Sequence, residues 1–63
     1  GAGSKADLEK ALKDKPIDYI LVNNAVRDAT NYVINEALIA ETYPLVFEDP
    51  YEDTKIYQVR KAP

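Results

Sequence analysis

Acidic residues cluster in one short segment near the C-terminal end of the chain. The four carboxylates are Glu48, Asp49, Glu52 and Asp53. Oxygen-rich clusters can bind Ca²⁺ or Mg²⁺, and paired carboxylates can act as a general acid and base when a pocket shifts the pKa of one of them. The spacing is not that of an EF-hand, and the segment lacks the glycine that such a loop requires. We interpret residues 48–53 as a solvated hairpin turn, with a cation site as the open alternative.

The residue types that are absent exclude several kinds of chemistry. The chain has no cysteine and no histidine. Disulfides, thiolate metal sites and nucleophilic pairs such as Ser–His or Cys–His are therefore excluded. We predict no catalytic, metal-binding or cofactor-binding residue, and we expect that the chain is not an enzyme.

Two short phrases resemble motifs of the short-chain dehydrogenases. Leu-Val-Asn-Asn-Ala at residues 21–25 is similar to the family's Asn-Asn-Ala-Gly motif, and Tyr51 and Lys55 have its Tyr-x-x-x-Lys spacing. That family needs a glycine-rich turn against a pyrophosphate, whereas the only glycines here are Gly1 and Gly3. Its Tyr and Lys also lie one turn apart on a helix, but a strand would separate them by ~13 Å at roughly 3.3 Å per residue. We therefore reject this assignment.

The composition is that of one small globular domain. The 63 residues carry a net charge of −3 and are 46% hydrophobic. This mild acidity argues against nucleic acid and anionic membrane surfaces as partners, and no apolar run reaches the roughly 20 residues of a membrane span. We interpret residues 1–4, Gly-Ala-Gly-Ser, as the remnant of a tag, and residues 5–63 as a single domain cut from a larger protein.

The first part of the chain predicts a helix and then a strand. Ser4 can cap a helix over residues 5–15, with Asp7 three residues further on as in a capping box. Pro16 is expected to stop this helix, because the residue before a proline is pushed out of the α region. Residues 17–22, Ile-Asp-Tyr-Ile-Leu-Val, are typical of a strand that is covered on both faces or lies at the centre of a sheet.

A second, longer helix is predicted over residues 25–41, with Asn24 as its N-cap. Apolar residues recur at helical spacing along one face, namely Val26, Ala29, Val33, Ala37 and Ala40. Tyr43 and Pro44 are expected to end the helix.

Residues 45–48 and 55–61 predict two further strands that form an antiparallel hairpin around the acidic turn. The first and second strands are joined by a helix and are therefore expected to run parallel. The predicted fold is a small α+β domain, in which two helices pack on a three-stranded mixed sheet in the order helix, strand, helix, strand, strand.

Five tyrosines are many for a chain of this length. Tyrosine is favoured in contacts between proteins, because it is large and rigid and carries one polar tip. Tyr19 and Tyr57 are expected on the sheet at the edge of the core. Tyr32 lies off the main apolar stripe of the second helix, next to Ile39 by helical angle. Together with Tyr51, these two residues form the candidate interaction surface.

A further resemblance covers about residues 16 to 60. The phrases are Lys-Pro-Ile-Asp-Tyr-Ile-Leu-Val-Asn-Asn at residues 15–24 and Tyr-Pro-Leu-Val-Phe-Glu-Asp-Pro-Tyr-Glu-Asp-Thr-Lys-Ile-Tyr-Gln-Val-Arg-Lys at residues 43–61. They resemble the soluble C-terminal segment of polytopic membrane glycosyltransferases that use lipid-linked sugars, with residues 17–19, 44–49 and 55–59 as the matching positions. This resemblance implies an extracytoplasmic accessory domain beside the membrane, whose parent protein holds the catalytic acidic residues elsewhere.

The sequence therefore predicts a non-catalytic accessory or interaction domain of a larger, membrane-bound glycosyltransferase-like protein. Its partner is expected to be the remainder of that protein or another protein. The alternative is a free-standing module that self-associates through a sheet edge or through the Tyr32–Ile39 patch.

Overall fold

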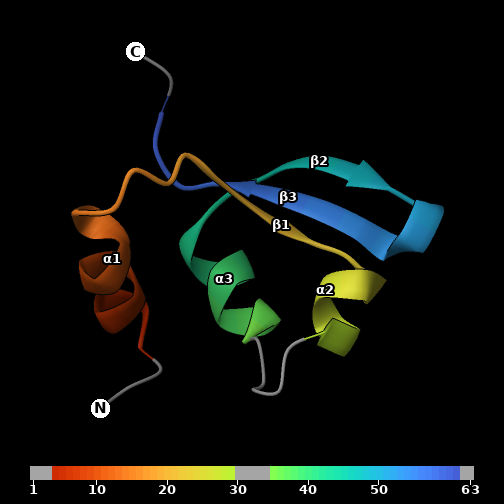
Figure 1. The fold of residues 1–63 in the computed structure, drawn as a ribbon. Helices are drawn as coiled ribbons and strands as arrows, with labels where there is room; N and C mark the ends of the chain where they lie inside the picture. Colours follow the sequence, from red (N-terminus) through yellow and green to blue (C-terminus); the bar gives the residue numbers. More distant parts are fainter. Residues whose placement is uncertain (1–3, 30–34, 62–63) are drawn as a thin grey trace.

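A computed structural model describes residues 4–29 and 35–61 and confirms a small α+β domain. Figure 1 shows three short helices below a three-stranded sheet, which is twisted. The radius of gyration of the Cα atoms is 11.9 Å. Along the chain, helical and extended segments follow the predicted order, except that the long second helix is replaced by two helices.

The first helix, α1 (Lys5–Lys13), begins and ends close to the predicted positions. The hydroxyl of Ser4 accepts a hydrogen bond from the backbone N–H of Asp7 at 3.1 Å, which satisfies one of the free donors of the first turn. Asp14 is the C-cap. The helix therefore ends at Lys13, three residues before Pro16, and the proline restricts the backbone of Lys15, the residue that precedes it.

The sheet is antiparallel throughout, so the prediction of a mixed sheet is wrong. Its strands are β1 (Tyr19–Val22), β2 (Leu45–Asp49) and β3 (Thr54–Gln58), and they lie in the order β1-β3-β2. Both outer strands pair with β3 in the antiparallel sense. Strands β1 and β2 run in the same direction, as expected, but the last strand of the hairpin lies between them and separates them.

The long helix predicted over residues 25–41 is also wrong, because the structure has α2 (Asn24–Ala29) and α3 (Glu36–Thr42) in its place. Asn35 breaks the helix: its φ of −83° and ψ of 80° are not helical. Its side-chain oxygen accepts a hydrogen bond from the N–H of Leu38 at 3.0 Å. An asparagine side chain that bonds to the backbone in this way favours a helix start over a helix interior.

The N-cap of α2 is Asn23 and not the predicted Asn24. The side-chain oxygen of Asn23 accepts a hydrogen bond from the N–H of Val26 at 2.8 Å, and its carbonyl accepts one from the N–H of Arg27 at 3.0 Å. Asn24 is instead the first residue of the helix. The two adjacent asparagines are equally good caps, so the residue type alone did not distinguish them.

The core lies between the helices and one face of the sheet. Its buried residues are Val22, Ile39, Tyr43 and Tyr57, and Leu8, Leu12, Ile20 and Val59 pack against them. Ala37 and Ala40 are exposed, so the apolar stripe predicted for the long helix does not form, and Val33 lies outside the described residues. Because α3 starts afresh at Asn35, it is Ile39 that turns towards the sheet.

The predicted hairpin between β2 and β3 is confirmed. The turn contains a short 3-10 helix, η1 (Tyr51–Asp53), and the carboxylate of Asp49 accepts a hydrogen bond from the N–H of Tyr51 at 2.9 Å. Glu52 and Asp53 have positive φ angles of 57° and 48°. This left-handed conformation is unfavourable for residues that carry a Cβ, and Asp tolerates it better than Glu does.

Candidate interaction surface

The register of the sheet assigns each strand residue to one of two faces. Tyr57 is buried in the core and lies opposite Ile20, so these two side chains, and Val22 two residues further along β1, point to the inner face. Successive side chains of a strand point to opposite faces. Tyr19 and Leu21 therefore point to the outer face.

The outer face continues across all three strands. Ile56 of β3 lies opposite Leu21, and Phe47 of β2 lies opposite Ile56. We call the four residues Tyr19, Leu21, Phe47 and Ile56 the outer apolar face. The register is irregular between Leu45 and Phe47, and the extra residue of a bulge changes which side chains reach a given face. Leu45 therefore lies opposite Tyr57, whereas Phe47 lies opposite Ile56.

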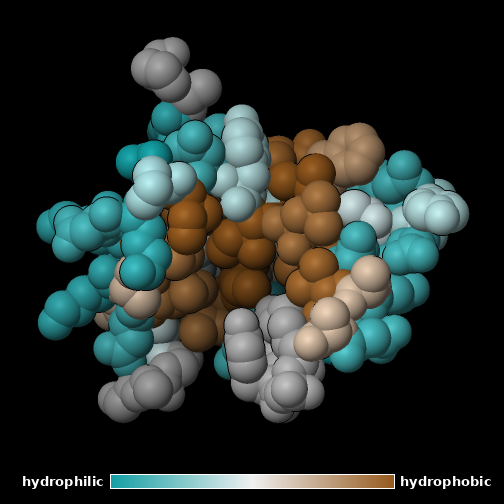
Figure 2. Space-filling view, in the orientation of Figure 1, coloured by the Kyte–Doolittle hydropathy of each residue, from teal (hydrophilic) through white to brown (hydrophobic). Residues whose placement is uncertain are grey.

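The outer apolar face lacks a covering element among the described residues. All three helices lie on the opposite side of the sheet (Figure 1). Tyr19, Leu21 and Phe47 are 53%, 46% and 50% exposed. Figure 2 views the molecule from the side, as Figure 1 does, and shows hydrophobic surface over the centre of the molecule, between the hydrophilic surfaces at its two ends. The outer apolar face points to the top of this view and is not seen face-on. Contiguous apolar surface on a small domain is characteristic of a contact site.

Strand β2 adds an open edge to this surface. It lies at one side of the sheet, and Leu45 and Val46 are about half exposed, like Phe47. The free N–H and C=O groups of an edge strand can pair with another strand, and a bulge such as the one near Val46 weakens that tendency. The edge is thus apolar but irregular.

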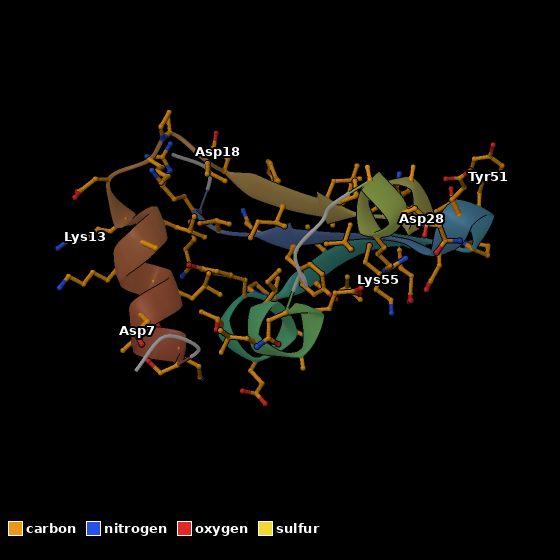
Figure 3. All side chains as sticks on the ribbon, turned by 60° about the horizontal axis from the view of Figure 1, so that its bottom comes forward. Asp7, Lys13, Asp18, Asp28, Tyr51 and Lys55 are labelled. Atoms are coloured by element: carbon orange, nitrogen blue, oxygen red, sulfur yellow. The ribbon has the colours of Figure 1, made fainter. Side chains whose placement is uncertain are left out.

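The predicted interaction residues divide into three groups. Tyr51 is 76% exposed and extends from the turn at the far end of the hairpin, away from the sheet (Figure 3). Ile39 is buried in the core, which removes it from the surface patch proposed for it. Tyr32 lies outside the described residues. The structure therefore does not bring these three residues together as one surface.

Sequence reasoning missed the outer apolar face. Residues 19–22 and 45–47 are apolar at every position, so both faces of these strands carry apolar side chains. The apolar run of β1 was interpreted as a strand covered on both faces or central in the sheet. The signal that could have identified it is the small number of helices, because two or three short helices can cover only one face of a sheet.

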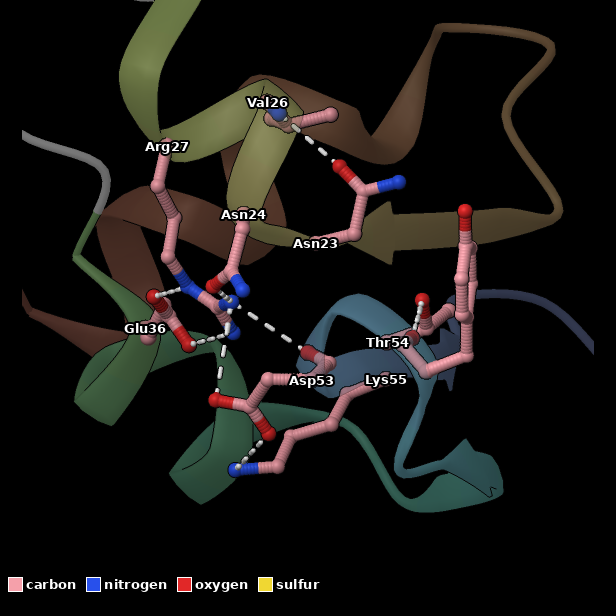
Figure 4. A network of polar contacts seen from close by, with 9 residues as sticks. Asn23, Asn24, Val26, Arg27, Glu36, Asp53, Thr54 and Lys55 are labelled. Atoms are coloured by element: carbon pink, nitrogen blue, oxygen red, sulfur yellow. Dashed lines mark hydrogen bonds and ion pairs between the residues drawn. The ribbon is translucent and has the colours of Figure 1, made fainter.

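A polar network joins the two halves of the interrupted helix (Figure 4). Arg27 of α2 donates to both carboxylate oxygens of Glu36 in α3, through Nε to Oε1 and through Nη2 to Oε2 at 2.9 Å. Its Nη1 also donates to the side-chain oxygen of Asn24 at 3.0 Å and to the carbonyl of Asp53 at 3.2 Å. One guanidinium therefore connects α2, α3 and the hairpin turn.

The electrostatics of this network follow from the same contacts. The hydrogen bonds from Arg27 lower the pKa of Glu36, with further lowering by the charges of Arg27 and Lys55, while partial burial opposes them. The pKa of Arg27 is raised in turn, mainly by its hydrogen bond to Glu36. The carboxylate of Asp53 lies 3.6 Å from Arg27 and 4.0 Å from Lys55. Both partners of the central pair thus stay charged at neutral pH.

The geometry gives no support to the dehydrogenase motifs. Tyr51 lies in η1 and Lys55 lies in β3, where its ammonium contacts Asp53. Asn23 caps α2. Within residues 4–29 and 35–61, no group of three or more Asp or Glu side chains could hold a metal ion. Of the acidic residues of the turn, Asp49 accepts a local hydrogen bond and Asp53 forms ion pairs with Arg27 and Lys55.

Comparisons with known proteins found no counterpart. No family model, curated protein or solved structure matches this chain. Within the described part of the chain, no helix is both long and apolar enough to cross a membrane. The resemblance to membrane glycosyltransferases stays a prediction.

Proposed function

We propose that this chain is a protein-docking domain whose outer apolar face packs against the remainder of a larger protein. The observation that carries the proposal is the uncovered set of apolar side chains on three neighbouring strands. In a domain this small, half of the sheet's apolar area is left in water unless a partner covers it. The domain would then serve position or stability within that protein rather than chemistry.

The size of the face favours a partner in the same chain over an independent one. Aromatic side chains bury about 150–250 Å² each and Leu and Ile somewhat less, so four side chains that are about half exposed or less leave on the order of 300–400 Å². At about 25 cal/mol per Å², this burial gives on the order of 8 kcal/mol, whereas association of separate molecules costs about 4–15 kcal/mol. A covalent tether removes much of that cost.

The parent proposed for the domain is a membrane-bound glycosyltransferase-like protein. The support is the resemblance of about residues 16 to 60, together with the uncovered sheet face that an accessory domain would place against its parent. The sequence that flanks the domain in its gene provides the test. Repeated apolar spans of about 20 residues are expected upstream, and a gene that encodes none would refute this parent.

A photocrosslinker tests the docking itself. Benzoylphenylalanine replaces Phe47 on the outer face and, as a matched aromatic control, Tyr51 at the end of the turn, in the complete gene product. We expect an intramolecular crosslink from position 47 and little or none from position 51. Equal crosslinking from both positions, or none from position 47, would contradict the proposal.

Self-association through the edge of β2 is the second candidate function, because Leu45, Val46 and Phe47 form an exposed apolar edge. Sedimentation equilibrium of the 63-residue chain separates it from the first. A tethered partner predicts a monomer from micromolar to millimolar concentration. A dimer that Val46→Lys dissociates, while Tyr51→Lys does not, would establish the second candidate and remove the first.

A further inference from the structure

A groove at the opposite end of the molecule from the hairpin turn is independent of the outer apolar face. It has a volume of about 590 Å³, within the range of about 300–1,000 Å³ that is usual for small-molecule sites. Three parts of the chain line it: the C-terminal half of α1, the C-cap residue of α3, which is Tyr43, and the segment after β3. The lining residues are Glu9, Lys10, Leu12, Lys13, Tyr43, Val59 and Arg60.

The floor of the groove is apolar. Leu12 and Val59 are half-buried members of the core cluster, and Tyr43 is buried. Among the residues that line the groove, Tyr43 is the one that carries a hydroxyl group. Burial, and then the carboxylate of Glu9, raise the pKa of Tyr43, so this hydroxyl stays protonated and can donate a hydrogen bond.

The rim of the groove is cationic, although the chain as a whole is acidic. Lys10, Lys13 and Arg60 line the groove together with one carboxylate, that of Glu9, whereas the net charge of the chain is −3. The carboxylate of Asp18 contacts Arg60 in addition. Within the described residues, neither lysine has an ion-pair partner. Lys13 extends outward from α1 into solvent (Figure 3), so its long stem can bring the ammonium over a ligand at the mouth.

The side chain of Arg60 is held by Asp18 through its Nε atom, which leaves its two terminal nitrogens as donors for a ligand. Its Nε donates to the carboxylate of Asp18 at 3.1 Å, and the backbone of both Val59 and Arg60 donates to the carbonyl of Asp18. Within the described part of the chain, its two terminal nitrogens form no further ion pair. Guanidinium donors of this kind suit a carboxylate or another planar anion.

We propose that this groove binds a single-chain alkyl carboxylate, such as a free fatty acid. The alkyl chain lies on Leu12, Tyr43 and Val59, and Arg60 with Lys10 and Lys13 holds the carboxylate. The combination of an apolar floor and a cationic rim on an acidic chain carries the proposal, because an anionic head and an apolar chain satisfy both parts at once.

Titration of the ¹⁵N-labelled 63-residue chain with dodecanoate, below its micelle concentration and at low salt, tests this site. We expect saturable amide shifts at Leu12, Tyr43, Val59 and Arg60. Dodecyltrimethylammonium, which has the same chain and the opposite charge, is expected to leave these amides unchanged. Shifts confined to Tyr19, Leu21, Phe47 and Ile56 would place the binding on the outer apolar face and overturn the proposal.

Charge variants test the rim. Lys10→Gln/Lys13→Gln is expected to weaken dodecanoate binding by about threefold or more, because two exposed charge contacts are lost. Lys5→Gln/Lys15→Gln removes the same charge outside the groove and is expected to keep the affinity within about twofold. Equal weakening by both pairs would refute a local site. Binding to anionic phosphatidylglycerol vesicles without binding of dodecanoate would also refute it, since the ligand would then be a membrane surface.

Discussion

Arg27 holds Glu36 through two parallel hydrogen bonds, and this ion pair joins the two separate helices α2 and α3. The side chains of Arg27 and Glu36 are only 22% and 32% exposed. Bidentate pairs of this kind are stronger than single-point surface ion pairs. The pair therefore sets how α2 and α3 lie relative to each other and to the hairpin turn.

Replacement of Glu36 by glutamine tests the contribution of this pair. Glu36→Gln removes the charge and keeps the size, so Arg27 loses its bidentate carboxylate partner. We expect the midpoint of thermal unfolding to fall by a few degrees, measured by circular dichroism. Glu41→Gln makes the same change at an exposed position of α3 and is expected to have little effect. Equal losses in both variants would show that the pair has no special role.

The pH dependence of stability has a sign that follows from the lowered pKa of Glu36. A carboxyl whose pKa is lower in the folded state stabilises the fold above its unfolded pKa, near the ordinary value of 4.5, and this contribution is lost as the pH falls through the folded pKa. The stability difference between the parent chain and Glu36→Gln is thus expected at pH 7 and should shrink below pH 4.5. Urea unfolding at a series of pH values measures it. A difference that is constant down to acid pH would contradict the role of the charge.

The two helix starts predict a specific pattern of cap mutations. Asn23→Ala and Asn35→Ala each remove a side-chain acceptor from a helix N-terminus and are expected to cost about 0.5–2 kcal/mol in unfolding free energy. Both side chains cap the N–H three residues later, of Val26 and of Leu38. Urea denaturation provides the measurement. If Asn35→Ala stabilised the chain instead, a continuous helix would be favoured and the observed break would be contradicted.

The core is small enough that one truncation should unfold the domain. Ile39→Ala is expected to cost about 2–5 kcal/mol, since it leaves a cavity beside Val22 and Tyr57. A domain of this length has a total stability of roughly 3–5 kcal/mol. Dispersed amide signals in an NMR spectrum should therefore collapse. Leu45→Ala, at an exposed edge, is the matched control and is expected to keep the folded spectrum.

The turn offers a stabilising substitution. Glu52 has a φ of 57°, a conformation that costs a residue with a Cβ about 1 kcal/mol and costs glycine little. Glu52→Gly is therefore expected to raise the unfolding free energy by about 0.5–1 kcal/mol, as measured by urea denaturation. Lys10→Gly, in the interior of α1, is expected to lower it by a similar amount. A loss of stability in Glu52→Gly would indicate that the turn does not adopt this conformation.

Local signals in the sequence were enough to predict the elements with strong boundaries. Ser4 marked the start of α1, and Pro16 marked its end within two residues. The acidic turn with Pro50 identified the hairpin of β2 and β3. In each of these places, one or two residues restrict the backbone whatever the rest of the chain does.

The remaining features depend on competition or on distant contacts. The helical spacing of apolar residues continues past Asn35 and favours one long helix. The side chain of Asn35 favours a new helix start instead, because it can accept a hydrogen bond from the backbone. The sequence does not say which of these two preferences is stronger. The central position of β3 depends on pairing between Tyr19 and Gln58, which are far apart in the sequence. The outer apolar face follows from that pairing and was therefore missed with it.

The central place of β3 also decides when the sheet can form during synthesis. Neither β1 nor β2 has a hydrogen-bonded neighbour until residues 54–58 have left the ribosome. Until then the nascent chain holds two unpaired apolar strands, and a ribosome stalled before this point would expose both of them to chaperones and proteases.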